Sequence, residues 1–242
     1  MLSRRWWFLL AVTLAVSALT ARLGFWQLGR AQQKESIYAQ QQAQMQAATL
    51  STADMLSRPA ASDGLYRRVD LQGEWMPSFL VYLANRSLQS QPGFQVLTPL
   101  RLKGNVAVLV VRGWAPRDWV DSNKLPEVQT PEGAVTVQGF WMPAPSHMLE
   151  LAAQPSESLQ GGGFQSLRQN IDVAAYGRET GLDIVATVQE VGEPSQGLIR
   201  QMPSILSGAD KNRAYAAQWF ALSALCVGLF VWFQIIQKLR HG

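Results

Sequence analysis

The apolar residues of the chain are concentrated in two stretches, one near each end. Residues 6–28 carry a single charge, Arg22, and residues 214–236 carry none. A helix needs about 20 apolar residues to cross a hydrocarbon core of about 30 Å, so both stretches are long enough. Aromatic residues, which favour the headgroup level, lie near both ends of each stretch: Trp6, Trp7, Phe25, Trp26, Tyr215, Trp219, Trp232 and Phe233. The pattern predicts two transmembrane helices.

Basic residues flank the two stretches at the chain ends, with Arg4 and Arg5 before the first and Lys238 and Arg240 after the second. Positive flanks mark the cytoplasmic side of a membrane. We therefore expect residues 1–5 and 237–242 in the cytoplasm and residues 29–213 on the periplasmic side of a bacterial inner membrane.

A cleaved signal peptide is the alternative interpretation of the N-terminus. Its candidate cleavage site at residues 19–21 has a leucine where a small residue is required, which favours a retained helix. Arg22 lies near the outer end of that helix, where its long side chain is able to reach the headgroups.

Residues 30–50 are rich in Ala and Gln and contain no Gly or Pro, which predicts a helical stalk leaving the membrane. Alternating and apolar runs then predict at least six strands, at residues 66–75, 79–83, 93–98, 106–111, 134–141 and 182–191. Short helices are expected at residues 118–122 and 172–180, the second capped by Asp172 and ended by Gly181. We expect an α+β, barrel-like domain, because exposed strand edges have to be closed or covered.

The net charge of +4 does not indicate a nucleic-acid partner. All 17 acidic residues and 16 of the 21 Lys and Arg lie between Arg30 and Arg213, so this part is close to neutral. The remaining basic residues belong to the chain ends and reflect topology. One cysteine, Cys226, excludes an intrachain disulfide, and two histidines exclude a multi-histidine metal site.

Sequence motifs of common enzymes are missing from the chain. It contains no GxSxG or HExxH pattern, and the glycine run at residues 161–163 lacks the Lys-Ser/Thr of a phosphate-binding loop. A nucleophile and base pair would have to use His147, which lies in a proline-flanked loop typical of a solvated histidine. The pattern favours a binding protein, and a membrane-tethered enzyme using His147 or scattered carboxylates remains the alternative.

Four short motifs, taken in order, resemble the surfeit locus protein 1 family of cytochrome c oxidase assembly factors. They are GFWQLGR at residues 24–30, PGFQVLTP at 92–99, VRGWAP at 111–116 and YAAQWF at 215–220. The resemblance implies a bacterial inner-membrane protein that assists maturation of the haem-copper oxidase. Implied partners are the oxidase core subunit, the haem a synthesis machinery and the membrane lipid.

The resemblance also implies a link to haem a, which some members are thought to bind. The family often has a histidine just before the second span, where this chain has Asn212 and Arg213. A histidine-ligated haem is therefore not expected in this chain, and a scaffold that binds no haem is an open alternative. A speculative site for the haem propionates uses Arg22, Arg30 and Arg213, all expected near the outer membrane surface.

The motif residues also have physical interpretations of their own. Gly24 and Ser17 are expected to let the two helices approach closely, Trp26 to anchor at the interface, and Gln27 to hydrogen-bond Gln218 or a partner helix. Gly113 is expected to permit a bulge, and Arg112 to pair with a carboxylate at the strand end. We expect a partner interface from the matching motif residues: Gly24, Trp26, Gln27, Arg112, Gly113, Trp114, Tyr215, Gln218 and Trp219.

Overall fold

The computed structural model describes the chain apart from residues 1–2, 58–63, 122–123, 147–163, 203–205 and 238–242. The chain divides into two compact units. One comprises residues 1–40 and 205–242 and is helical, and the other comprises residues 41–204 and is built mainly from strands.

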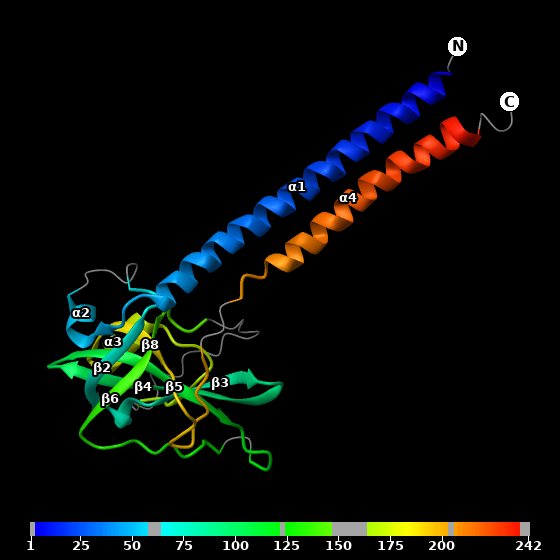
Figure 1. The fold of residues 1–242 in the computed structure, drawn as a ribbon. Helices are drawn as coiled ribbons and strands as arrows, with labels where there is room; N and C mark the ends of the chain where they lie inside the picture. The colour runs from blue at the N-terminus through cyan, green and yellow to red at the C-terminus, as the bar shows by residue number, and fades with distance from the viewer. Residues whose placement is uncertain (1–2, 58–63, 122–123, 147–163, 203–205, 238–242) are drawn as a thin grey trace. The chain divides into compact units, whose positions relative to one another are not determined.

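The helical unit is an antiparallel pair. Helix α1 (Arg4–Gln46) runs beside α4 (Ala209–Val231), which continues into the π-helical turn η2 (Trp232–Ile236), as Figure 1 shows. Each contains an apolar stretch long enough to cross a membrane. With a rise of about 1.5 Å per residue, α1 is about 65 Å long, roughly twice the thickness of a hydrocarbon core.

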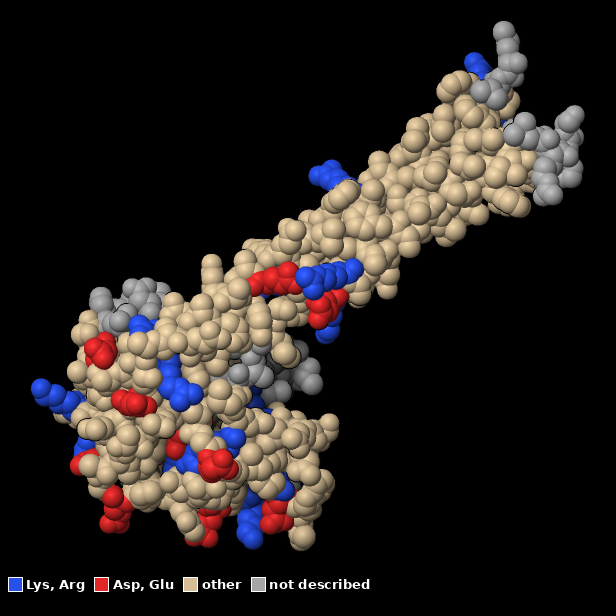
Figure 2. Space-filling model, viewed as in Figure 1, with Lys and Arg blue, Asp and Glu red and all other residues tan. Residues whose placement is uncertain are grey.

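Small residues form the seam between these helices. Ser17, Thr20 and Gly24 are buried on α1, and Ala216 is buried on α4. Side chains of this size allow two helix backbones to approach closely. Ser17 and Gly24 therefore lie buried between the helices, and at Gly24 the space is filled by the Phe220 ring of α4. Figure 2 shows that the displayed face of the helix pair is almost free of charged side chains along most of its length.

Five strands of the second unit close into a barrel: β2 (Arg68–Trp75), β6 (Ala134–Met142), β8 (Asp183–Glu190), β5 (Val106–Pro116) and β4 (Gln91–Lys103). They are hydrogen-bonded in this order, and β4 pairs again with β2 at Trp75↔Leu100. Only β5 and β8 run parallel among these pairs. Alternate side chains of the strands fill one apolar core that includes Leu71, Val108 and Val188.

Shorter elements surround the barrel. Strand β3 (Val81–Leu88) pairs with β4 outside the closed ring and carries β7 (Leu167–Arg168) on its other side. Strand β1 (Leu50–Ser51) adds to β2, and the 3-10 turn η1 (Pro77–Phe79) precedes β3. Helix α2 (Thr52–Leu56) begins with a capping box between Ser51 and Asp54.

Helix α3 (Val173–Thr180) confirms the predicted helix and both of its ends. The Asp172 carboxylate accepts the backbone N–H of Ala175 at 2.7 Å, and Gly181 ends the helix with a φ of 70°. Tyr176, a residue of this helix, is fully buried and donates its hydroxyl to the carbonyl of Phe79 at 2.5 Å. Its ring belongs to a second apolar cluster with Leu83, Leu97 and Val111.

Two local predictions need correction. The expected strand at residues 79–83 begins only at Val81, because Pro77–Phe79 forms a 3-10 turn, and it continues to Leu88. The expected helix at residues 118–122 is wrong for residues 118–121, the part that the structure describes. There the Asp118 carboxylate accepts the N–H groups of Val120 and Asp121, at 2.8 and 3.1 Å, and fixes a turn instead.

Candidate functional site

The four sequence motifs form two pairs, one in each unit. In the β domain, the motif at residues 92–99 lies on β4 and the motif at 111–116 lies on β5, and the two strands are antiparallel neighbours. Gly93 pairs with Pro116, Gln95 with Trp114, and Val96 with Gly113. Two motifs that are separate in the sequence therefore form one continuous patch of sheet.

Trp114 is held in this patch by contacts on two sides. Its Nε1 donates to the carbonyl of Arg86 at 2.6 Å, and the residue is only 6% exposed. The indole lies where Gly93 has no side chain, because a Cβ there would be 2.3 Å from Trp114 Cζ2.

The predicted bulge lies at Arg112 and Gly113. Val96 pairs with Gly113 and the next residue, Leu97, pairs with Val111, so Arg112 is the extra residue of β5. Gly113 has a φ of 155°, and a Cβ there would be 2.7 Å from the carbonyl oxygen of Ile199. This position requires glycine for both its backbone conformation and its space.

Arg112 is fully buried. We expected it to pair with a carboxylate, but its hydrogen-bond partners are of other kinds. Its guanidinium donates to Thr130 Oγ1 at 2.8 Å, to the carbonyl of Gln129 at 2.7 Å and to Gln196 Oε1 at 2.6 Å. It also lies over the Trp75 ring, 4.7 Å from the centroid. Burial lowers the pKa of Arg112, and the charge of Glu190 partly opposes that effect.

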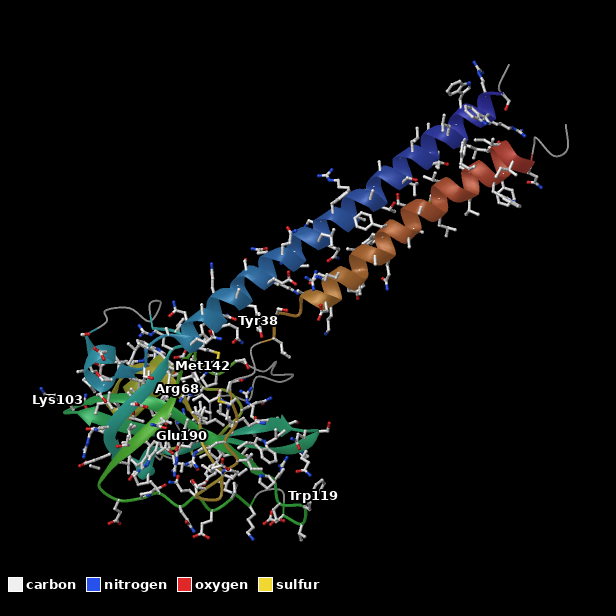
Figure 3. The ribbon with its side chains drawn as sticks, in the orientation of Figure 1. Tyr38, Arg68, Lys103, Trp119, Met142 and Glu190 are labelled. Carbon is white, nitrogen blue, oxygen red and sulfur yellow. The ribbon has the colours of Figure 1, made fainter. Side chains whose placement is uncertain are left out.

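A second arginine joins this buried cluster. Gln196 Oε1 also accepts from Arg200 Nη2 at 3.1 Å, and Arg200 forms an ion pair with Glu190 at 2.7 Å. The Glu190 side chain is 12% exposed, and its Oε2 has no hydrogen-bond partner among the described residues. Burial raises the pKa of this carboxyl, and Arg200 opposes the shift. Glu190 lies among the strands of the barrel in Figure 3.

A cavity of about 530 Å³ opens beside this cluster and the two motif strands. Its wall includes Glu190 at the end of β8, Gln95 on β4, Gly113 and Trp114 on β5, and Arg86 on β3. Because the wall contains residues of both β-domain motifs, we take this cavity as the candidate functional site of the β domain.

In the helical unit, the first and fourth motifs face each other. Gly24 leaves room for the ring of Phe220, since a Cβ at Gly24 would be 2.6 Å from Phe220 Cε1. Phe25 also contacts Phe220 edge to face, with ring centroids 5.1 Å apart. The motif at residues 24–30 therefore packs against the motif at 215–220.

Gln27 bonds across the helix pair, but its partner differs from the predicted one. Its Oε1 accepts from Asn212 Nδ2 at 2.6 Å, and Asn212 Oδ1 accepts from Lys34 Nζ at 2.8 Å. Gln218, the expected partner, is exposed. Asn212 lies in the segment where the family often has a histidine, and in this chain it bridges two residues of α1.

The structure does not bring Arg22, Arg30 and Arg213 together around one point. Arg22 and Arg30 are on α1, about 12 Å apart along the helix axis. Arg30 donates to Gln33 at 2.9 Å, whereas Arg213 is paired with Glu35 at 2.5 Å and with Asp210 at 3.3 Å. Arg213 already has two carboxylate partners.

The remaining motif residues lie on the surface of the helix pair. Trp26 and Tyr215 are 58% and 54% exposed, Gln218 is exposed, and Trp219 is half-buried. Their places are compatible with anchoring in a lipid interface or with a partner helix, and both roles stay predictions.

A haem bound through a histidine of the helix pair does not fit the residues of α1 and α4. Neither α1 nor α4 contains a histidine, and both histidines of the chain, His147 and His241, lie outside the described residues. Among the described residues, no group of three or more His, Cys, Asp or Glu is placed to hold a metal ion. The basic residues Lys238 and Arg240, on which the topology prediction depends, also lie outside the described part.

Sequence reasoning missed Glu190, Arg200, Gln196 and Arg86 as a group. Glu190, Gln196 and Arg200 come from one stretch at residues 190–200, which the fold brings to Arg112, and Arg86 on β3 shares a cavity wall with Glu190. The one signal in the sequence was that Glu190 ends an apolar strand, a place where a charged residue is frequently exposed and has no special role.

Residues 14–224 match the SURF1 family. A SURF1-like protein of Rickettsia conorii is 25% identical over 222 residues, which cover 86% of this chain and 84% of the relative. A SURF1-like protein of Rickettsia felis is 24% identical over 227 residues, which cover 91% and 94%. An uncharacterized SURF1-like protein of Mycobacterium tuberculosis is 24% identical over 185 residues, which cover 75% and 66%. The family match includes all four motifs and most of the sequence, so this chain belongs to the SURF1 family.

Proposed function

We propose that this protein is a membrane-anchored assembly factor for the haem-copper cytochrome c oxidase and that it acts by binding the core subunit during maturation. The observation that carries the proposal is membership of the SURF1 family, which is generally linked to cytochrome c oxidase assembly. The pairing of the four motifs, two in each unit, supports a role for both units.

The two apolar helices support the anchoring part of the proposal. Both are long enough to span a bilayer, and in the most apolar 18-residue window of each helix 17% of the residues of α1 and none of those of α4 and η2 are buried. Such a surface requires an apolar environment. In our proposal the helix pair lies in the inner membrane with both ends cytoplasmic, and the β domain is periplasmic.

Binding, and not catalysis, is the proposed mode of action. The motif residues Gly24, Gly93, Gly113 and Trp114 shape packing surfaces, and Arg112 organises a buried cluster. Haem a is at most a transient cargo in this proposal, because the helix pair supplies no histidine. The maturation step that it assists is then the stabilisation of the core subunit.

Co-purification tests the proposal. The full-length tagged protein is purified in detergent from cells that are synthesising the oxidase, and the core subunit and the optical spectrum of haem a are measured in the same sample. We expect the core subunit to be retained, and a Gly24→Val variant with a weakened helix pair to retain less, relative to Gly29→Val at an open position of the same helix. A core subunit that is absent from the wild-type sample contradicts the proposal.

A further inference from the structure

We propose that the cavity between β3, β5 and β8 binds an extended polypeptide segment of the partner protein. The inference rests on the proposed function for the identity of that partner. The cavity's own chemistry gives the class of ligand.

Carboxamide side chains dominate the polar part of the wall. Asn85, Gln95, Gln189 and Gln201 all line the cavity, and each carries both donors and an acceptor. Among the described residues, the side chains of Asn85 and Gln95 have no hydrogen-bond partner, and Gln189 uses only its Nε2, donating to the carbonyl of Gln201 at 2.8 Å. A peptide backbone presents N–H and C=O groups in alternation, which is the pattern that such a wall satisfies.

Both charged groups in the cavity wall already have partners within the protein. Within the described part of the chain, Arg86 and Glu190 are the only charged residues in its wall. The Glu190 carboxylate is paired with Arg200 at 2.7 Å, and the Arg86 guanidinium donates to the carbonyl of Ser146 at 2.9 Å, so neither group is a free charge for an ionic ligand. A chain of neutral amides is the better match.

The apolar part of the wall gives room for side chains. Trp114, Val111 and Ile199 lie among the carboxamides, and the volume of about 530 Å³ is within the range of ligand sites. Tryptophan next to amide groups is the composition expected of a site that holds both a backbone and an apolar side chain.

One wall of the cavity is also an unpaired strand edge. On the side opposite β4, β7 pairs with β3 at Tyr82 and Leu83 only. Beyond these residues, no strand within the described part of the chain pairs with that side of β3. Ser87 follows on this edge and lines the cavity, as does Arg86, whose carbonyl already accepts from Trp114 Nε1. Unpaired strand edges bind extended peptides by adding them as a further strand.

A direct binding measurement tests the inference. Fluorescein-labelled 12-residue peptides that together cover the periplasmic loops of the oxidase core subunit are titrated with the full-length protein in detergent, and anisotropy is recorded. The variants are Gln95→Leu on the wall and Gln201→Leu on an exposed loop position that leaves the strands unchanged. Gln72→Leu, an exposed glutamine on β2 outside this cavity, is the matched control.

We expect at least one peptide to bind and each wall variant to weaken it roughly three- to tenfold, the effect of one lost amide hydrogen bond, with Gln72→Leu unchanged. If no peptide binds, or if both wall variants bind as the wild type does, the inference is wrong. Because co-purification measures the proposed function separately, a retained core subunit without peptide binding would overturn this inference alone.

Discussion

Gly93 and Trp114 fit together as a gap and the ring that fills it. The two residues come from neighbouring strands, and a Cβ on Gly93 would lie 2.3 Å from Trp114 Cζ2 and 2.4 Å from the carbonyl oxygen of Ala115. The second contact is with backbone, so the gap cannot be regained by moving a side chain. The fit fixes one wall of the cavity and links two of the four family motifs.

Gly93→Ala should therefore destabilise the β domain by about 1–3 kcal/mol, the usual cost of overpacking a close-packed site. Thermal unfolding of the full-length protein in detergent, followed by circular dichroism, measures the effect. Gly104→Asn is the control, because Gly104 lies in a turn with a φ of 57° and open space around it, a conformation that asparagine accepts. Equal melting temperatures for the two variants would contradict the close fit of Gly93 and Trp114.

Arg112→Lys tests the buried cluster. A lysine cannot reproduce the planar set of donors that reaches Thr130, Gln129 and Gln196, so at least one buried acceptor loses its partner. We expect a loss of about 2–4 kcal/mol in unfolding free energy. Arg101→Lys is the matched control, since Arg101 pairs with Glu74 on the surface and such pairs contribute about 0–1 kcal/mol. A neutral Arg112→Lys would show that the cluster is not needed for stability.

The bond between Gln27 and Asn212 predicts coupling between α1 and α4. In a double-mutant cycle with alanine at both positions, the coupling free energy should be about 0.6 kcal/mol, the average for interhelical hydrogen bonds in membranes. Reversible unfolding in mixed micelles of mild detergent and SDS provides the free energies. The corresponding cycle for Gln27 and Gln218 should give no coupling. Coupling in that second cycle alone would favour the partner expected from the sequence.

The raised pKa of Glu190 predicts a specific pH dependence of stability. Burial makes the folded state hold its proton at pH values where the unfolded chain, with a pKa of about 4.3, has released it. The stability that protonated Glu190 contributes is complete below that unfolded pKa and is lost as the pH rises through the higher folded pKa.

Wild-type stability should therefore decline relative to Glu190→Gln across this window and level off above it. Melting temperatures of both proteins at steps from about pH 4 to pH 8 measure the difference. Glu193→Gln, which removes an exposed carboxylate from the next loop, is the matched control. A difference between wild type and Glu190→Gln that grows in favour of the wild type with rising pH would contradict the raised pKa.

Local features of the fold were predictable because their causes are local. The strands expected at residues 93–98 and 106–111 form β4 and β5, and Asp172 and Gly181 bound α3 as expected. The failed helix at residues 118–122 is also a local effect. There the Asp118 carboxylate satisfies backbone N–H groups in a turn, in competition with a helix.

Features that join distant segments were not predictable from the pattern. Barrel closure depends on Trp75 meeting Leu100, and the buried cluster brings Gln196 to Arg112 from 84 residues away. Asn212 reaches Gln27 across 185 residues. Each of these residues has several chemically possible partners, and periodicity along one strand or helix does not choose among them.

Loss of the gene tests the central claim most directly. Membranes of a deletion strain and of the same strain carrying the wild-type gene are compared by reduced-minus-oxidised spectra of haem a and by cytochrome c oxidase activity. If the protein assists oxidase assembly, both signals fall together in the deletion strain and return with the gene, while transcription of the core subunit is unchanged. Normal haem a absorption and normal oxidase activity in the deletion strain would contradict the claim.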